Sequence, residues 1–213
     1  MKKRVLGYYD YTVILTYAGM LFAFCGIIKV LDQAYGRAIF CLMIAGICDM
    51  FDGTIASTKV RSISEKRFGI QIDSLSDLIS FGVLPAIFVY MICEKNPFIG
   101  LISALFVLCA LIRLSYFNVL EEERQSQTSG KRKSYLGLPV TTIGLTLPLV
   151  YLLYDYGTLK RSLCFPVLLI LMGVGFLSPM EIKKPEGPGK LCLVILGILE
   201  ALGILFFMGW DLI

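Results

Sequence analysis

The chain has 213 residues, of which 57% are hydrophobic and 17% charged, and its formal net charge is +4. A soluble domain of this length has too little interior to bury that much apolar surface, so the composition excludes an ordinary soluble globular protein. Histidine is absent, which excludes histidine-based acid–base catalysis, histidine–metal sites and phosphohistidine intermediates.

Apolar stretches of membrane-spanning length recur along the chain and are separated by short polar segments. The pattern predicts an all-α, polytopic membrane helix bundle that forms a single integral membrane domain over residues 1–213. Pro85 lies inside the third predicted span, where it is expected to kink or divide the helix. In chain order, the predicted spans cover residues 11–31, 36–57, 69–93, 98–120, 139–155, 162–178 and 190–209.

The polar segments alternate between many and few basic residues. Dense basic clusters precede span one and follow spans two, four and six. The positive-inside rule then places the N-terminus and all of these clusters on the cytoplasmic side of the cell membrane. Membrane lipids with anionic headgroups are expected partners, and no nucleic-acid partner is expected. The clusters contain Lys2, Lys3, Arg4, Lys59, Arg61, Lys66, Arg67, Arg124, Lys131, Arg132, Lys133, Lys183, Lys184 and Lys190.

Two longer polar segments separate the later spans. Residues 121–137 carry mixed charge and are interpreted as a solvated linker, with a direct role in substrate binding as the alternative. Residues 178–190 are rich in proline and glycine and are typical of a connector.

Four aspartates lie where spans two and three meet the predicted cytoplasmic face. Asp49 and Asp52 are three residues apart, and Asp73 and Asp77 are four apart, so each pair shares one helix face. Because a short segment joins the two spans, they run antiparallel. We therefore expect the two pairs to face each other at similar depth.

Carboxylates in this position are costly. An aspartate at a helix centre costs about 2.5–3.5 kcal/mol on insertion scales, and less near the interface. A cluster of them also repels itself, so it must take up protons or bind a cation. Since the spacing offers no histidine or paired cysteine, the hard divalent ions Mg²⁺ and Mn²⁺ suit this oxygen-only site.

Small residues accompany the aspartates at Gly53, Ala56 and Gly69. Such residues let a bulky ligand approach the backbone closely. Mg²⁺ commonly binds through carboxylates together with substrate phosphates. The sequence therefore predicts a phosphate or diphosphate substrate at the cytoplasmic face.

This spacing resembles the signature of the CDP-alcohol phosphatidyltransferases, D-x-x-D-G-x-x-A followed by G-x-x-x-D-x-x-x-D. The motif covers residues 49–77 and reads "DMFDGTIA" (49–56), then "GIQIDSLSD" (69–77). Three stretches resemble the phosphatidylserine synthase branch: "DSLSDLISFGVLPA" (73–86), "LIRLSYFNV" (111–119) and "YLGLPV" (135–140). The resemblance implies a six-helix core with one or two extra C-terminal spans, and a homodimer.

The resemblance also implies an activity, transfer of the phosphatidyl group of CDP-diacylglycerol to the hydroxyl of L-serine with release of CMP. Asp49, Asp52 and Asp73 would hold one or two divalent ions, Mg²⁺ or Mn²⁺. Asp77 would complete the metal site and act as the general base. The same chemistry with glycerol 3-phosphate or inositol phosphate as acceptor is the nearest alternative.

The nucleotide diphosphate would lie beside Asp49 and the small residues of the motif. The family usually has arginine where this chain has Ser57, and the spacer that follows, before Gly69, is longer than usual. A bidentate arginine is not readily replaced, so Lys59 and Arg61 are the candidates to supply its charge. The predicted diphosphate-binding residues are Asp49, Gly53, Ala56, Ser57, Lys59, Arg61 and Gly69.

Arg113, near the cytoplasmic end of span four, is expected to face the site and to bind the carboxylate of serine or the substrate phosphate. Asn118 would be a polar contact nearby. The alternative is that Arg113 neutralises the aspartates or reaches the interface. Thr12 and Thr16, one turn apart on span one, are candidates to line the cavity or to pack between helices.

Two other classes of protein share some of these sequence features. A cation-coupled transporter also carries intramembrane carboxylates, but it predicts acids near mid-membrane and discontinuous helices in symmetric halves. A structural membrane protein leaves the aspartate cluster unexplained.

Overall fold

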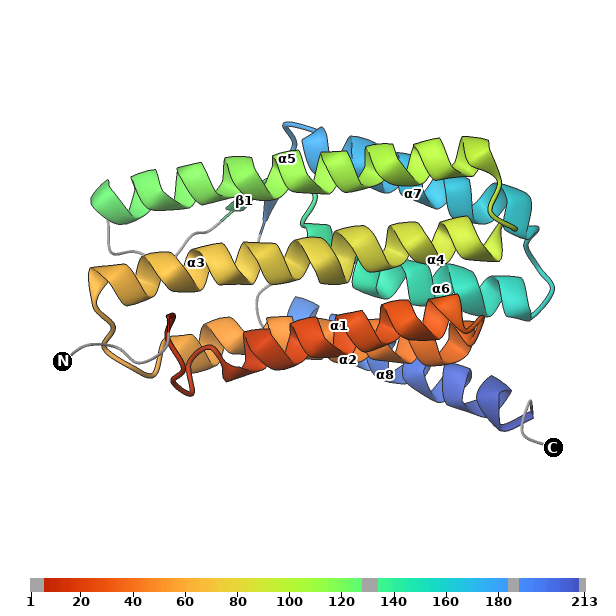
Figure 1. Cartoon of the computed structure of the whole chain (residues 1–213), viewed down its shortest axis with the longest axis horizontal. Coiled ribbons are helices and arrows are strands. Elements are labelled where there is room, and N and C mark those ends of the chain that lie inside the picture. Colours follow the sequence, from red (N-terminus) through yellow and green to blue (C-terminus); the bar gives the residue numbers. More distant parts are fainter. Residues whose placement is uncertain (1–5, 128–133, 184–187, 211–213) are drawn as a thin grey trace.

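The computed structural model describes residues 6–127, 134–183 and 188–210, and the helices lie side by side in one bundle (Figure 1). The main helices are α1 (Ile14–Leu31), α2 (Tyr35–Ala56), α3 (Ile63–Asp77), α4 (Leu84–Ile92), α5 (Pro97–Gln127), α6 (Ile143–Asp155), α7 (Arg161–Leu177) and α8 (Pro188–Trp210). The short elements are the π-helix η1 (Leu78–Val83), the 3₁₀-helix η2 (Val140–Thr142), and the strands β1 (Ser134–Leu136) and β2 (Glu181–Lys183).

The helices are apolar enough to place this protein in a membrane. Among the described residues, four continuous helical segments, called rods below, are long and apolar enough to cross a bilayer. They are Ile14–Leu31, Tyr35–Ala56, Ile63–Ile92 (α3, η1 and α4 together) and Pro97–Arg124. Shorter apolar helices cover Val140–Asp155, Arg161–Leu177 and Cys192–Phe206. Large side chains such as Leu105 and Leu171 are exposed along the outer faces, which suits contact with lipid. The protein is a polytopic, all-α integral membrane protein, as predicted.

The third rod begins earlier than the predicted span 69–93. Ser62 and Glu65 form a capping box, in which the Glu65 N–H donates to Ser62 Oγ at 3.2 Å and the Ser62 N–H donates to Glu65 Oε2 at 2.7 Å. Such a box satisfies backbone donors at a helix start, so the helix extends into the polar segment. The fourth rod likewise continues to Gln127, and both rods reach past α6 and α7 (Figure 1).

Pro85 interrupts the third rod in a specific way. It stands in the first turn of α4, immediately after the π-helical turn of η1. A π-helical turn inside a longer helix changes the direction of the following side chains and accommodates the missing N–H of proline. The rod therefore stays continuous. Where the sequence predicts a kink or a division of the helix at Pro85, the structure has a wider, π-helical turn instead.

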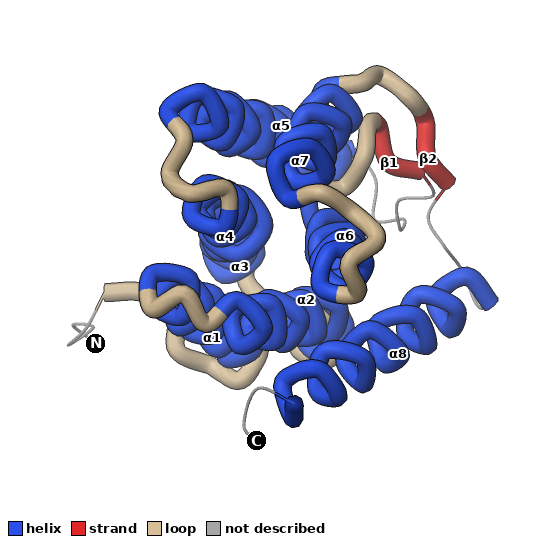
Figure 2. The backbone as a smooth tube through the Cα atoms, turned by 90° about the vertical axis from the view of Figure 1, so that its right-hand side faces the viewer, coloured by secondary structure: helices blue, strands red, loops and turns tan. Residues whose placement is uncertain are grey.

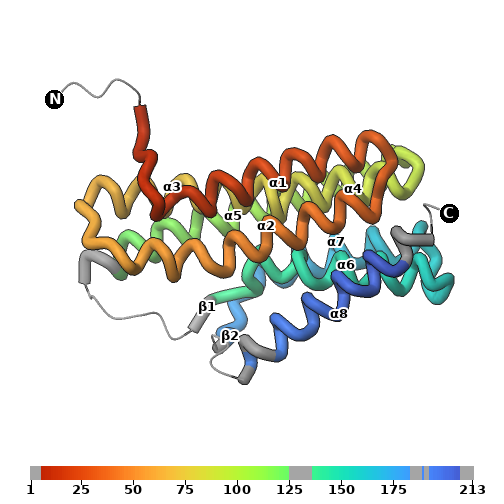
Figure 3. Tube along the Cα trace, turned by 90° about the horizontal axis from the view of Figure 1, so that it is seen from below, coloured from red at the N-terminus to blue at the C-terminus, as the bar shows by residue number. Residues whose placement is uncertain are grey.

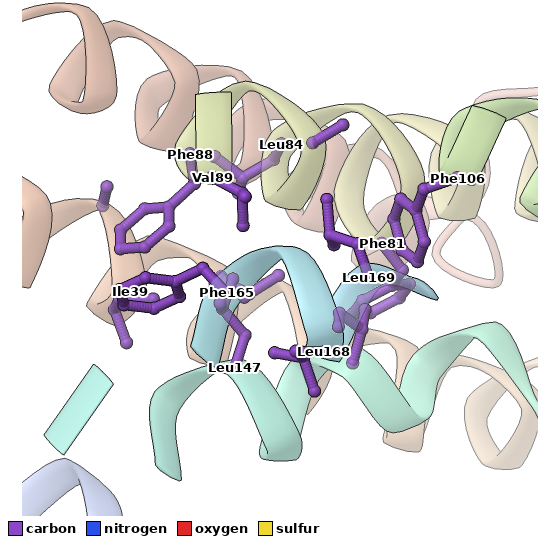
Figure 4. Close-up of a cluster of buried hydrophobic side chains, with 14 of the residues drawn as sticks. Ile39, Phe81, Leu84, Phe88, Val89, Phe106, Leu147, Phe165, Leu168 and Leu169 are labelled. Atoms are coloured by element: carbon purple, nitrogen blue, oxygen red, sulfur yellow. The ribbon is translucent and has the colours of Figure 1, made fainter. Parts of the chain in front are cut away.

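Glycines allow close packing of α1 against α2. A Cβ on Gly19 would lie 3.2 Å from Cys48 Cβ, and one on Gly26 would lie 3.1 Å from Cys41 Cβ. At the centre of the bundle, buried aromatic and aliphatic side chains from α4 to α7 interlock (Figure 4). Phe88 and Phe165 meet there with ring centroids 5.9 Å apart. Figure 2 shows α8 across the outside of α2 and α6.

The two polar segments interpreted as linkers are paired where the structure describes them. Strands β1 and β2 are antiparallel, with Tyr135 opposite Ile182, beside the end of α7 (Figure 2). Gly137 follows with a φ of +77°, and a Cβ there would lie 2.8 Å from Ser178 O. Only glycine fits this position without strain. The basic residues predicted at 2–4, 131–133 and 184 lie outside the described residues.

Candidate metal centre

The aspartates of α2 and α3 meet in the structure. Asp49, Asp52 and Asp73 each offer a carboxylate oxygen, and these oxygens lie within 4.8 Å of one another. Asp77 is not in that group of three, but its carboxyl group contacts Asp49, while Asp52 contacts Asp73. The spacings of three and four residues thus place both pairs on facing helix sides.

A small cavity lies among these carboxylates. Its volume is about 10 Å³, which is room for one water molecule or one ion. Asp77 is the last residue of α3, and the adjacent π-helical turn contributes Ser80 and Phe81 to the lining. The lining therefore combines the carboxyl groups with hydroxyl and apolar side chains. π-Helical turns occur frequently at functional sites, and here one follows a candidate catalytic residue.

Helix α1 supports the acidic cluster through hydrogen bonds. Thr16 Oγ1 donates to Asp52 Oδ2 at 3.0 Å, and both residues are buried. Ser76 Oγ donates to the backbone oxygen of Thr16 at 3.3 Å, which ties α3 to the same turn of α1. Of the two candidate threonines on span one, Thr16 therefore reaches the cavity. Thr12 instead donates to Asp10 through both its N–H and its hydroxyl.

The residues present fit a divalent cation. The donors are carboxylate oxygens, which Mg²⁺ and Mn²⁺ prefer, and the group contains no thiolate that would favour a softer metal. Carboxylates this close repel one another unless a proton or a cation lies between them. A cation held in the small cavity that they line would remove that repulsion.

One side of the cluster is open. A Cβ added to Gly53 would meet nothing within 4 Å. Ala56 is the last residue of α2, and Ser57 caps it with an exposed side chain whose hydroxyl donates to Thr54 O at 2.6 Å. Ser57 thus closes its own helix end. The small residues of the motif leave space beside Asp52 for a large ligand.

The two basic candidates near this opening differ in their contacts. Lys59 Nζ donates to Asp10 Oδ2 at 2.6 Å and to Glu65 Oε1 at 3.3 Å. Its ammonium group is therefore already paired with two carboxylates. The Arg61 guanidinium lies over Gly69, where an added Cβ would be 3.0 Å from Arg61 Nη1. Within residues 6–127, 134–183 and 188–210, Arg61 has no ion pair with an acidic side chain.

The candidate acceptor-binding residues lie outside the small cavity. Arg113 is buried, its Nε donates to Leu138 O at 3.4 Å, and its guanidinium carbon is 5.5 Å from the ring centroid of Phe117. Asn118 Oδ1 accepts a hydrogen bond from Ser74 Oγ at 2.7 Å, next to Asp73. Their roles toward an acceptor stay predictions.

Comparison with known proteins decides the family. The sequence profile of the CDP-alcohol phosphatidyltransferases matches residues 12–178, which include all four aspartates and helices α1 to α7. The chain belongs to the CDP-alcohol phosphatidyltransferase family. Members of this family use a divalent metal ion, in agreement with the acidic donor set of this chain.

Several curated members of the family are similar over most of this chain. An archaetidylserine synthase of Methanothermobacter thermautotrophicus is 34% identical over 80% of this chain and 69% of that protein. A CDP-diacylglycerol–serine O-phosphatidyltransferase of Methanocaldococcus jannaschii is 32% identical over 85% of this chain and 83% of that protein. The corresponding protein of Saccharomyces cerevisiae is 34% identical over 70% of this chain and 59% of its own length.

Some residues at the site carry no signal in the motif. Ser76 and Ser80 are polar residues on a predicted membrane span, and that placement alone could have marked them as cavity-lining. Asp10 precedes the first span and gave no such signal, because its partner Lys59 lies 49 residues away.

The hydrogen bond from Thr16 predicts a measurable contribution to metal binding. Outer contacts that orient metal ligands are typically worth 10–100-fold in affinity. Mn²⁺ binding is measured as the Mn²⁺ concentration that gives half of the maximal thermal stabilisation of the purified protein. We expect Thr16→Val to raise this concentration by about tenfold or more. Thr16→Ser keeps the hydroxyl group and should leave the concentration unchanged.

Thr146→Val is the matched control. Thr146 Oγ1 donates to Thr142 O within its own helical turn, away from the aspartates. If the two valine variants respond equally to Mn²⁺, the Thr16 contact does not support the metal site.

Proposed function

We propose that this protein transfers the phosphatidyl group of CDP-diacylglycerol to the hydroxyl of L-serine and releases CMP. The observation that carries the proposal is the cluster of Asp49, Asp52, Asp73 and Asp77 beside an open, glycine-lined face. Its position in the family supports the donor substrate, and the serine-specific names of the similar proteins support the acceptor.

In this proposal, Asp49, Asp52 and Asp73 hold the divalent cation, Mg²⁺ or Mn²⁺, and the diphosphate lies along Gly53, Ala56 and Gly69. When bound, the ion offsets negative charge on the diphosphate and on the departing CMP. The carboxylates would hold one or two such ions, and the open space beside Gly53 would remain available to phosphate oxygens.

Asp77 is proposed as the general base. A bond forms between the serine hydroxyl oxygen and the phosphorus of the phosphatidyl group, the bond from phosphorus to the CMP oxygen breaks, and Asp77 takes the hydroxyl proton. Asp77 touches Asp49 but lies outside the group of three oxygens, which suits a residue that faces both the ion site and the acceptor. A carboxylate is a weak base toward an alcohol, so alignment of the reacting groups must supply much of the acceleration.

The acceptor pocket is proposed to lie toward α5, where Asn118 contacts Ser74 and Arg113 is buried. A buried cation suits the carboxylate of serine. The active site is proposed to face the cytoplasm, across the cell membrane from the loops between α4 and α5 and between α6 and α7. The basic clusters around the α2–α3 connection support this orientation.

CMP release with different acceptors tests the proposed function. We expect the purified protein in CDP-diacylglycerol vesicles to release CMP with L-serine and a divalent ion. Asp77→Asn should lower the rate about 10²–10⁴-fold, the usual contribution of a general base. Asp32→Asn, at the other end of α1, is the matched control. Turnover only with glycerol 3-phosphate or inositol phosphate would show that the acceptor is wrong.

Arg61 is proposed as the cation that contacts the diphosphate, in place of the arginine that the family usually has at position 57. It lies over Gly69 without an acidic partner among the described residues, whereas Lys59 already has two. Position 57 itself carries an exposed serine. The longer spacer of this chain therefore supports a displaced arginine.

Substitution of Arg61 tests this assignment. A hydrogen bond to a charged group is worth about 1.5–3 kcal/mol, so Arg61→Ala should raise the KM for CDP-diacylglycerol by about 10–100-fold. Ser57→Arg in the Arg61→Ala background should restore part of the affinity. Lys66→Ala, an exposed cation on α3, is the control. Equal effects of the two alanine variants would assign the diphosphate to other residues.

A homodimer is proposed through the groove between α4 and α5. This groove has a volume of about 410 Å³ and is lined mainly by apolar residues. Gly100 and Ala104 stand in it at the small-xxx-small spacing that lets membrane helices approach closely. Ser103 Oγ is buried at its base and has no hydrogen-bond partner among the described residues. In a two-fold arrangement, the same groove of a second copy would pack against this one.

The mass of the protein in mild detergent tests the homodimer. We expect a dimer for the wild type and a monomer for Ala104→Leu, because the larger side chain fills the groove. Val174→Leu, on the exposed face of α7, should remain dimeric. A monomeric wild type would leave the groove to lipid chains.

A further inference from the structure

The N-terminal segment before α1, residues 8–12, lies against the connection between α2 and α3. Both are at the same end of the bundle (Figures 1 and 3). Tyr8 and Phe68 meet with ring centroids 5.2 Å apart. The hydroxyl groups of Tyr11 and Thr58 are 3.2 Å apart. The segment thus contacts both the connection and the first turns of α3.

Asp10 makes the strongest contacts of this segment. One carboxylate oxygen, Oδ1, accepts hydrogen bonds from the N–H and the hydroxyl of Thr12, and the other, Oδ2, accepts one from Lys59 Nζ at 2.6 Å. The hydrogen bond from Lys59, followed by that from Thr12, lowers the pKa of Asp10 from 3.8 to about 2. The contribution of this contact to stability is therefore present above about pH 4 and lost as the pH falls toward 2.

Lys59 extends the contact to α3. Its Nζ also donates to Glu65 Oε1 at 3.3 Å, and Glu65 is the capping-box residue whose other oxygen accepts from the Ser62 N–H. A single ammonium group thus joins the segment before α1 to Glu65 in the first turn of α3. Asp10 raises the pKa of Lys59, which keeps this group charged.

We propose that Asp10 and Lys59 form a positioning clasp that fixes the α2–α3 connection, so that Arg61 lies over Gly69 and meets the diphosphate. The inference rests on the function proposed above. It makes Lys59 a positioning residue rather than a ligand of the diphosphate, and it adds Asp10, which no sequence motif marks.

The clasp acts on a short, irregular part of the chain. Residues 57–62 join the two helices that carry the aspartates, and their backbone lies outside regular helix from Ser57 to Ser62. Holding such a segment in one arrangement costs conformational entropy. Contacts that meet this cost before the substrate arrives improve binding by preorganisation. Arg61, two residues after Lys59, is the side chain most directly positioned.

The test compares Asp10→Asn, Lys59→Gln and the double variant with Asp32→Asn, which removes the exposed Lys29–Asp32 pair at the far end of α1. Kinetics measures KM for CDP-diacylglycerol and kcat. Hydrogen exchange measures the backbone amides of residues 58–62 and needs no activity. If the acceptor or the reaction is wrong, the exchange experiment still reports on the clasp.

We expect Asp10→Asn and Lys59→Gln each to raise KM about threefold to tenfold with kcat within twofold. The double variant should be no worse than Lys59→Gln alone, since that substitution already removes the contact with Asp10 as well as the one with Glu65. The backbone amide hydrogens of residues 58–62 should exchange faster than in the wild type in all three variants. In Asp32→Asn their exchange rates should be unchanged. Two results would overturn the clasp. One is a wild-type KM and wild-type exchange in Asp10→Asn. The other is a KM increase from Lys59→Gln that persists undiminished in the Asp10→Asn background, which would show that Lys59 acts independently of Asp10.

Discussion

Mutual repulsion among four aspartates within an apolar bundle is the constraint on which the rest of this structure depends. Asp49, Asp52 and Asp73 bring oxygens within 4.8 Å of one another, and Asp77 contacts Asp49. In a membrane protein, charged groups this close need a cation, a proton or water. The fold gives them a cavity of about 10 Å³ and open space beside Gly53, where a divalent cation would offset their charge.

The surrounding elements can be understood by how they hold this cluster. Thr16 on α1 fixes one carboxylate, and Ser76 fixes the same turn of α1. The π-helical turn next to Asp77 rotates the side chains that follow it relative to those that precede it. The residues before the turn line the polar site, and those after it pack in the buried aromatic core. Outside the membrane, Lys59 joins the segment before α1 to the start of α3. Each of these contacts fixes the position of acidic or basic groups that would otherwise repel one another or adopt several conformations.

Much of this arrangement could be predicted from sequence, because it depends on periodicity. Apolar runs predict most helix ends to within a few residues, except the start of α3 and the end of α5, and spacings of three and four predict that the aspartates lie on facing sides. The helix start at Ile63 was missed although Ser62 and Glu65 carry a capping-box pattern, since the apolar run begins later. Contacts such as Asp10 with Lys59 join residues 49 positions apart, and pairing of β1 with β2 joins two segments that read as solvated linkers. Neither follows from local pattern.

The assignment of Arg61 also needed the structure. The sequence offered Lys59 and Arg61 equally, and geometry separates them, because Lys59 has two carboxylate partners while Arg61 lies over Gly69. The four aspartates are proposed to form a divalent-cation site. Binding of Mn²⁺ to the purified protein, followed by its electron paramagnetic resonance signal, is the decisive measurement. We expect saturable Mn²⁺ binding that Mg²⁺ displaces, that Asp52→Asn abolishes and that Asp32→Asn retains. Equal Mn²⁺ binding by the wild type and Asp52→Asn would contradict this proposal.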